Sequence, residues 1–366
     1  MRRSFPRAAV VALVAVVLAP ALAAEVTRTL KIEVPPAAAR FAIENLAGAM
    51  RISSGPGDTV VAVATVHAES EDLAALVRFE KVADATRPDT FRVRYPYEKS
   101  TSFRYPGSGK GESHQGWLDS FVGSGTTTKY DGHKVKVSGG SGLLVYADLE
   151  IQLPRRAVDG AFRNLVGPLH ATGVEGKLQF DTGSGKINLE EVKGEIKSDA
   201  GSGDVKATNL EGSFACGTGS GDCILDGFRG DTVSLSVGSG DMRLSSIVAK
   251  KLSSDAGSGD LTAVDIDVEE IDTDAGSGNV EITAKSARLA RVKSDAGSGD
   301  LTLRLGPDAS FDAHVEQGSG EIVNRYADAQ PIVQGKEVIG YRRGTGRTRI
   351  DFEAGSGDLV LEPGTL

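Results

Sequence analysis

Apolar and polar residues alternate along most of this chain, in short runs that meet at a Gly-Ser-Gly tripeptide. Before the tripeptide, apolar or small residues alternate with polar ones, as in residues 196–200 (IKSDA). After the tripeptide the alternation resumes, as in residues 205–207 (VKA). Alternation with a period of two indicates strands that bury one face. Each copy is therefore predicted to be a strand, a Gly-Ser-Gly corner, a second strand and a second corner.

The tripeptide recurs at nearly constant spacing. From residue 183 onward, its first glycine stands at positions 183, 201, 219, 238, 257, 276, 297, 318 and 355, in steps of 18, 18, 19, 19, 19, 21, 21 and 37 residues. A unit this short cannot bury its own apolar face, so copies stack and hydrogen-bond, coil upon coil. We expect an all-β protein, a parallel β-helix or β-solenoid of roughly nine coils of 18–21 residues each. A β-propeller fits less well, because its blades need about 40 residues and four strands.

Glycine and acidic residues occupy fixed positions at the corners. The glycines are expected to permit a positive φ and a tight bend without a Cβ clash. Two interpretations of the acids stay open: each carboxylate accepts hydrogen bonds from backbone N–H groups of its own corner, or Ca²⁺ bridges carboxylates of neighbouring coils. The first is preferred, because the known Ca²⁺-binding nonapeptide repeat has a turn about every nine residues. The acids and one amide in these columns are Asp181, Asp199, Asp255, Asp274 and Asp295 before the corners, and Asp204, Asp222, Asp241, Asp260, Asn279, Asp300, Glu321 and Asp358 after them.

The beginning of the chain has the pattern of a secretory signal peptide. Residues 1–7 are basic, residues 8–18 are apolar, and residues 21–23 (ALA) form a small-x-small cleavage signal. Residues 1–23 are therefore predicted to be removed, with cleavage after Ala23 or Ala24. No later run reaches 18 apolar residues, so no membrane span is expected. The predicted location is the periplasm, the cell surface or the extracellular space.

The rest of the chain divides into three parts. Residues 24–97 are predicted to form a smaller β-rich N-terminal region, in which Ser70 is the N-cap of a short helix. Residues 98–142 are rich in Gly and Ser, contain Trp117, and are predicted to be a long surface insertion that is partly disordered. The solenoid repeats occupy residues 143–366. They contain an insertion at 325–349, predicted to be an extra hairpin or an irregular coil with a basic tip.

These motifs together resemble a known family. Gly-Ser-Gly-Asp units, each followed by an apolar residue, come after a leader strand that ends at Leu153 and Pro154. Residues 44–48 (ENLAG) and the acidic residues 70–72 (SED) lie ahead of them. This arrangement resembles the bacterial DUF4097 family of β-strand repeat proteins, described as candidate adhesins. The resemblance covers most of the mature chain, departs at the two insertions, and implies an exported, non-enzymatic β-helix without established ligand or catalytic residues.

Charge and composition narrow the function further. Without Arg2, Arg3 and Arg7 the chain keeps 38 basic and 50 acidic residues, a formal net charge of −12 (38 − 50). An acidic exported protein is poorly suited to bind nucleic acid. Forty-six glycines and 5% aromatic residues fit a turn-rich protein with a thin core better than a helical enzyme.

Candidate chemistry is sparse. Cys216 and Cys223, the only cysteines, occupy inward-facing positions on the two sides of one corner. In an oxidising compartment they are candidates for a disulfide, with two buried thiols as the alternative. The five histidines are scattered and none accompanies the corner serines at regular spacing, so no catalytic, metal-binding or cofactor-binding residue is predicted.

We therefore predict an exported, non-enzymatic β-helix protein of the cell envelope with an adhesin, binding or scaffold role. Its partner is expected to be a protein or polysaccharide of the envelope or the cell surface. The alternatives are a Ca²⁺-stabilised surface repeat protein and, less favoured, a carbohydrate-active β-helix enzyme. The enzyme would need a cleft with clustered carboxylates beside basic or aromatic residues.

Overall fold

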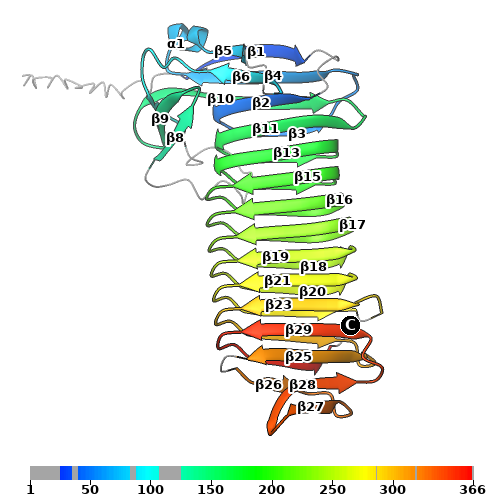
Figure 1. Ribbon diagram of the computed structural model, residues 1–366. Coiled ribbons are helices and arrows are strands. Elements are labelled where there is room, and N and C mark those ends of the chain that lie inside the picture. Colours follow the sequence, from blue (N-terminus) through cyan, green and yellow to red (C-terminus); the bar gives the residue numbers. More distant parts are fainter. Residues whose placement is uncertain are drawn as a thin grey trace, which may run out of the picture.

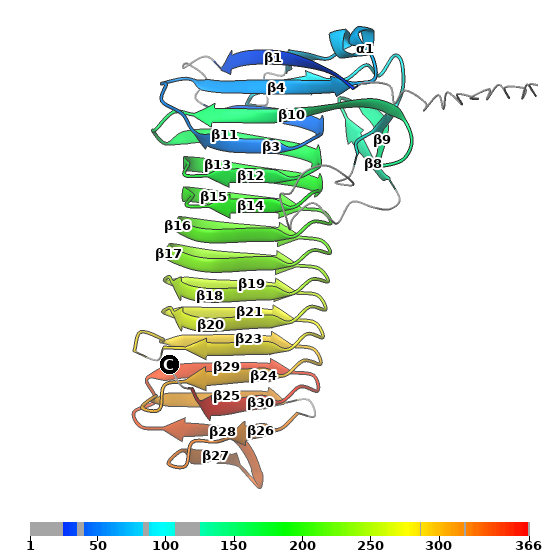
Figure 2. The ribbon, with the colours of Figure 1, turned by 180° about the vertical axis from the view of Figure 1, so that it is seen from behind.

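The computed structural model describes residues 25–34, 40–82, 88–106, 125–285, 287–317 and 320–364. The chain winds into a long, flattened β-solenoid of two facing sheets (Figures 1 and 2). We call the sheet that faces the viewer in Figure 1 the front sheet and the one that faces the viewer in Figure 2 the rear sheet. The predicted signal peptide and its cleavage position lie outside the described residues.

Strands before each corner build the front sheet, and strands after it build the rear sheet. In the front sheet these are β11 (Val158–Val166), β13 (Glu175–Ser184), β15 (Lys193–Ala200), the second halves of β16 (Val205–Thr218) and β17 (Cys223–Val237), β19 (Lys251–Ala256), β21 (Glu270–Ala275) and β23 (Arg291–Ala296). In the rear sheet they are β12 (Leu169–Thr172), β14 (Ile187–Glu190), the first halves of β16 and β17, β18 (Met242–Val248), β20 (Leu261–Asp267), β22 (Val280–Ala284) and β24 (Leu301–Leu305). All these neighbours pair in parallel. The predicted β-solenoid is confirmed.

Like residues stack on like residues in the core. Equivalent positions of successive units are register partners, as are Phe162 and Phe180, whose rings stack with centroids 5.6 Å apart. The predicted apolar positions, such as Ile196 and Val205, are buried between the two sheets. Stacking therefore gives each short unit the apolar partner surface that it lacks alone.

The corner glycines are needed because neighbouring corners approach closely. None of the described glycines in the Gly-Ser-Gly corners has a positive φ, so that expectation was wrong. A Cβ placed on Gly259 would lie 1.7 Å from the carbonyl oxygen of Gly240 in the adjacent coil, and one on Gly203 would lie 1.9 Å from that of Gly185. The Cβ clash that glycine avoids is thus with the next coil, not within the bend.

Antiparallel strands close the N-terminal end. A first coil of β2 (Phe41–Ala47) and β3 (Met50–Ser54) pairs with β11 and β12. The rear sheet continues through β10 (Leu143–Leu153), β4 (Val60–Ala68) and β1 (Val26–Val34), and the front sheet through β6 (Asp89–Arg94) and β5 (Arg78–Val82). The predicted short helix is confirmed as α1 (Glu71–Leu76). Ser70 is its N-cap, and its Oγ accepts a hydrogen bond from the Leu73 N–H at 3.3 Å.

The Gly/Ser-rich segment is more ordered than we expected where the structure describes it. It contributes β7 (Ser102–Arg104), β8 (Thr126–Tyr130) and β9 (His133–Ser138), a small sheet beside the N-terminal corners (Figure 1). Phe103 and Tyr130 are buried there around Tyr95, which they meet edge to face. The sequence suggested a surface insertion because aromatic side chains so widely spaced give no periodic signal. Trp117 lies outside the described residues.

At the C-terminal end the coils leave chain order. After β25 (Phe311–Gln317) and β26 (Ile322–Asn324), the chain forms an antiparallel hairpin of β27 (Gln330–Gln334) and β28 (Glu337–Arg343). It then returns as β29 (Thr348–Ala354) and β30 (Leu359–Pro363), which insert between β23/β24 and β25/β26. The insertion at 325–349 is thus the hairpin of our two alternatives. In the part of the chain that the structure describes, no helix is long and apolar enough to cross a membrane.

Candidate functional site

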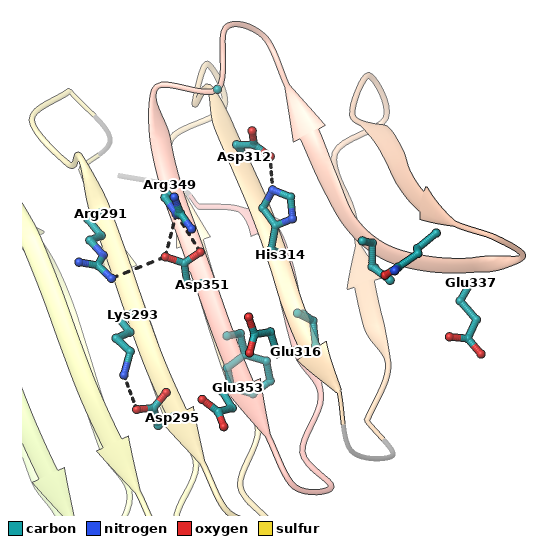
Figure 3. Close-up of a pocket in the computed structure, with 15 residues that line it drawn as sticks. Arg291, Lys293, Asp295, Asp312, His314, Glu316, Glu337, Arg349, Asp351 and Glu353 are labelled. Atoms are coloured by element: carbon teal, nitrogen blue, oxygen red, sulfur yellow. Dashed lines mark hydrogen bonds and ion pairs between the residues drawn. The ribbon is translucent and has the colours of Figure 1, made fainter.

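A groove of about 800 Å³ lies on the outer face of the front sheet at its C-terminal end (Figure 3). Its floor is formed by β23, β29 and β25, and Gln334, Glu337 and Ile339 of the β27–β28 hairpin line its side. The groove lies where β28, which pairs antiparallel with Phe311–His314 of β25, leaves that strand, and its floor includes β29 of the coil that inserts between β23 and β25. Neither feature belongs to the regular repeat.

Register arranges the charged side chains of the floor in three rows. Outward residues of β23, β29 and β25 are direct neighbours, because the three strands pair in parallel. The rows are Arg291–Arg349–Asp312, Lys293–Asp351–His314 and Asp295–Glu353–Glu316. The first row is mostly basic and the third is entirely acidic, so charge changes sign across the groove.

Ion pairs hold the basic groups of the groove (Figure 3). The Lys293 Nζ lies 2.6 Å from the Asp295 Oδ2, and the Arg349 Nε lies 2.9 Å from the Asp351 Oδ2. Arg291 reaches the same carboxylate of Asp351 at 3.8 Å. No basic side chain that lines the groove is therefore left without a carboxylate.

The acids of the third row are less fully paired. Among the described residues, Glu353 and Glu316 have no ion-pair partner, and Glu337 of the hairpin has none either. Six carboxylates and three basic side chains line the groove, a formal balance of −3 (3 − 6) with His314 neutral. Buried Phe352 and partly buried Ile339 add apolar surface nearby. The groove thus suits a partner that carries positive charge.

The predicted basic tip is not a free cationic patch. Arg342 forms an ion pair with Asp312, whose other oxygen lies 2.8 Å from the His314 Nε2. Arg343 pairs with Asp328 at 2.6 Å and lies over the Tyr326 ring, 5.0 Å from its centroid. These arginines fix the hairpin to the solenoid.

The carboxylates after the corners form a ladder between coils. The Asp222 Oδ1 accepts a hydrogen bond from the backbone N–H of Asp241 at 2.9 Å, and the Asp260 Oδ1 accepts that of Asn279 at 2.7 Å. We expected each carboxylate to accept from its own corner, and the donor instead belongs to the next coil. That outcome follows from parallel stacking, which places each N–H beside the equivalent side chain of its neighbour. The whole ladder runs through Asp204, Asp222, Asp241, Asp260, Asn279, Asp300, Asp358 and Glu321.

The other candidate residues are not gathered into a metal site. Within the described ranges, no group of three or more His, Cys, Asp or Glu side chains could hold a metal ion. Cys216 and Cys223 are both buried and face each other in the core, with Cα atoms 7.0 Å apart. Of the five histidines, His114 lies outside the described residues.

A second cluster of titratable groups lies on the N-terminal strands and could not be recognised from the sequence. His67 of β4 stacks on Tyr146 of β10 with ring centroids 4.4 Å apart. Its Nδ1 lies 2.5 Å from the Glu25 Oε1, and its Nε2 lies 3.4 Å from the Asp148 Oδ2. Burial by itself would lower the pKa of His67, but the hydrogen bonds and charges of Asp148 and Glu25 outweigh burial and raise that pKa. The cluster fastens β1 to β4 and β10.

No curated protein matches the sequence. Among solved structures, the chain is similar to a "putative adhesin" from Parabacteroides merdae, with 11% identity, a TM-score of 0.42, and coverage of 92% of this chain and 95% of that one. A "putative adhesin" from Parabacteroides distasonis gives 12% identity, a TM-score of 0.42, and coverage of 92% and 96%. A "putative lipid binding protein" from Parabacteroides distasonis gives 11% identity, a TM-score of 0.40, and coverage of 91% and 96%.

The decisive match is to a family model, which covers residues 148–362 and so takes in the regular coils, the hairpin and the intercalated coil. The chain belongs to the Toastrack DUF4097 family.

Proposed function

We propose that this protein is an exported, non-enzymatic binding or scaffold protein of the cell envelope, which contacts its partner through the groove at the C-terminal end of the front sheet. The observation that carries the proposal is the groove itself, where the outer face is hollowed and carboxylates stand without ion-pair partners. Elsewhere on the front sheet some outward charges are paired, as Lys177 is with Glu195 and Lys193 with Glu211, each at 2.9 Å. Asp255 and Asp274 also have no ion-pair partner among the described residues, but they lie outside the groove.

The basic and histidine side chains of the groove favour binding over catalysis. A general base or nucleophile must be free to exchange a proton or attack. Lys293 and Arg349 are both engaged by carboxylates, and His314 faces Asp312. Among the described residues that line the groove there is no Ser, Thr or Cys for a histidine to activate.

The charge of the groove indicates the class of partner. Glu316 and Glu353 are register neighbours on β25 and β29, and Asp295 stands next to Glu353 on β23. Adjacent carboxylates repel one another, and a cationic partner relieves that repulsion. We therefore propose a partner with exposed basic groups, either a protein segment with Lys or Arg or a surface polysaccharide with free amines.

A pair of matched double variants tests the proposal. Glu316→Gln with Glu353→Gln removes two charges from the groove at nearly constant volume. Asp255→Asn with Asp274→Asn removes two charges from the same outward row on β19 and β21, outside the groove. Envelope components are captured on the mature protein, and the purified partner is then titrated by biolayer interferometry at low and high salt. The groove variant should bind about tenfold more weakly, about 1.4 kcal/mol, while the control binds as the wild type does. Equal binding by all three proteins would refute the groove as the binding site.

A carbohydrate-active enzyme is the competing function, because the groove does bring clustered carboxylates beside Arg and Lys. It is tested by incubating the protein with envelope glycans and separating the products by chromatography. Glycan cleavage that the Glu316→Gln, Glu353→Gln variant abolishes would replace binding with catalysis. Intact glycans in both samples would support the binding function.

A further inference from the structure

The C-terminal coil, residues 348–363, is held between two coils that precede it in the chain (Figures 1 and 2). Ile350 of β29 is the register partner of Val292 in β23 on one side and of Ala313 in β25 on the other. β30 lies in the same way between β24 and β26. Strand edges on both sides and in both sheets therefore form a slot that the C-terminal coil fills.

The two coils that flank the slot match the coil inside it. Most inward register positions are apolar in all three, with Val292, Ile350 and Ala313 in the front sheet and Leu301, Leu359 and Ile322 in the rear sheet. The polar exceptions are Ser294, the register partner of Phe352, and Asn324, the register partner of Leu361. The side-chain ladder also continues, because the Asp300 Oδ1 accepts from the Asp358 N–H and the Asp358 Oδ1 accepts from the Glu321 N–H. Coil 311–324 thus has the pattern to stack directly on coil 291–305 as well as on the C-terminal coil.

The slot is expected to be filled last. Ser236 and Asp255, register partners in successive regular coils, stand 19 residues apart, whereas Val292 and Ile350 stand 58 apart. Closing a longer loop costs more chain entropy and slows the contact. Coil 311–324 therefore reaches coil 291–305 first, and the C-terminal coil has to enter between them.

We infer that this slot accepts the C-terminal coil of a second copy of the chain, so that two copies exchange their C-terminal coils. A coil that fills the slot has to form backbone hydrogen bonds with both neighbouring coils and point apolar residues inward at the spacing of the unit. The C-terminal coil of a second copy meets both requirements, because its sequence is the same. The chain enters β29 through Gly344 and Gly346, which have φ values of 62° and 69°, in a region where glycine allows a change of direction. Exchange keeps every strand pairing and changes only which molecule supplies β29 and β30.

Cross-linking of full-length chains tests the exchange outside the groove. Thr302 of β24 and Val360 of β30 are outward register partners in the rear sheet. Thr302→Cys and Val360→Cys chains are refolded together as an equal mixture and treated with a short thiol cross-linker. The matched control is a mixture of Thr262→Cys and Glu281→Cys chains, whose positions lie in the same outward row on β20 and β22, successive coils of the regular stack. The double variant Thr302→Cys, Val360→Cys in one chain reports the arrangement within a monomer.

Exchange predicts a covalent heterodimer of doubled mass in the first mixture and its absence from the control mixture. Monomers of the double variant should cross-link within one chain and, once cross-linked, no longer form dimers with other copies. A first mixture that gives no more heterodimer than the control overturns the exchange. Failure of the double variant to cross-link at all, either within one chain or between two chains, overturns the intercalated coil order, and the exchange with it. A result that overturns only the exchange does not bear on the groove, which the charge variants test separately, whereas loss of the intercalated coil order would also remove β29 from the floor of the groove.

Discussion

The Asp300 Oδ1 accepts a hydrogen bond from the backbone N–H of Asp358 at 2.8 Å, although 58 residues separate the two in sequence. The same bond joins Asp222 to Asp241 across only 19 residues. The ladder therefore follows the spatial order of the coils rather than the order of the chain. Its carboxylates serve as acceptors for corner N–H groups that the parallel strand ladder does not satisfy.

Removal of one ladder carboxylate should destabilise the fold. Asp222→Ala leaves the Asp241 N–H without its acceptor and should lower the free energy of unfolding by about 1 kcal/mol. Asp222→Asn should cost less, because an amide oxygen also accepts, as Asn279 does from the Asp300 N–H at 3.1 Å. Chemical denaturation measures both. The control is Asp231→Ala, whose ion pair with Lys250 is highly exposed, so that its loss should change little. An equal loss in Asp222→Ala and Asp231→Ala would show that the ladder bond contributes nothing.

The ladder also predicts sensitivity to acid. The hydrogen bond from the Asp241 N–H, and then the Arg243 side chain, lower the pKa of Asp222 below the ordinary value of 3.8. A lowered folded-state pKa gives stability that is present above 3.8 and is lost as pH falls through the folded value. The Tm of the wild type should therefore fall more steeply in acid than that of Asp222→Asn. Parallel curves of Tm against pH, followed by circular dichroism, would contradict this.

The stability that His67 contributes should depend on pH with the opposite sign to that of Asp222. Its pKa is raised, despite burial, by Asp148 and Glu25, so the protonated imidazolium stabilises the folded state. This stability is complete below the ordinary pKa of 6.5 and is lost as pH rises through the raised value. His67→Phe keeps the ring contact with Tyr146 but does not titrate, so it should lose the fall in Tm above neutral pH. A variant curve that still falls there as the wild-type curve does would assign the effect to another group.

A methyl group at a corner should disrupt stacking. Gly259→Ala would place its Cβ 1.7 Å from the Gly240 carbonyl oxygen, and backbone cannot yield locally. We expect a loss of about 3 kcal/mol or more, or failure to fold. Gly57→Ala is the control, because a Cβ there meets nothing within 4 Å. Thermal melts of both variants measure the difference, and a Gly259→Ala protein as stable as the control would refute the close approach.

We propose that Cys216 and Cys223 are joined by a disulfide in the exported protein. The unreduced protein should then weigh two hydrogens less than the reduced one by mass spectrometry. Because the closed loop is short, reduction should lower the free energy of unfolding by only about 2 kcal/mol. Labelling of both thiols after denaturation without reductant would show that they are free.

The sequence predicted the repeat well because that information is local. Alternation around Val205 and spacing between corners define the strands, their buried faces and the stacking, and Ser70 marks the start of α1. The order of the coils at the C-terminal end could not be predicted from the sequence, because β23, β25 and β29 carry the same pattern. The groove depends on that order and on where the hairpin leaves the stack, so its residues could be recognised as charged and outward but not as neighbours.

The antiparallel strands at both ends have a consequence for how this protein varies in size. They close the stack without reference to how many parallel coils lie between them, so a whole coil can be gained or lost in the middle while both ends stay intact. Each coil that is gained or lost would move the cluster around His67, at the N-terminal end, about 4.8 Å farther from or nearer to the groove. The number of coils therefore sets the distance between the two ends of the molecule.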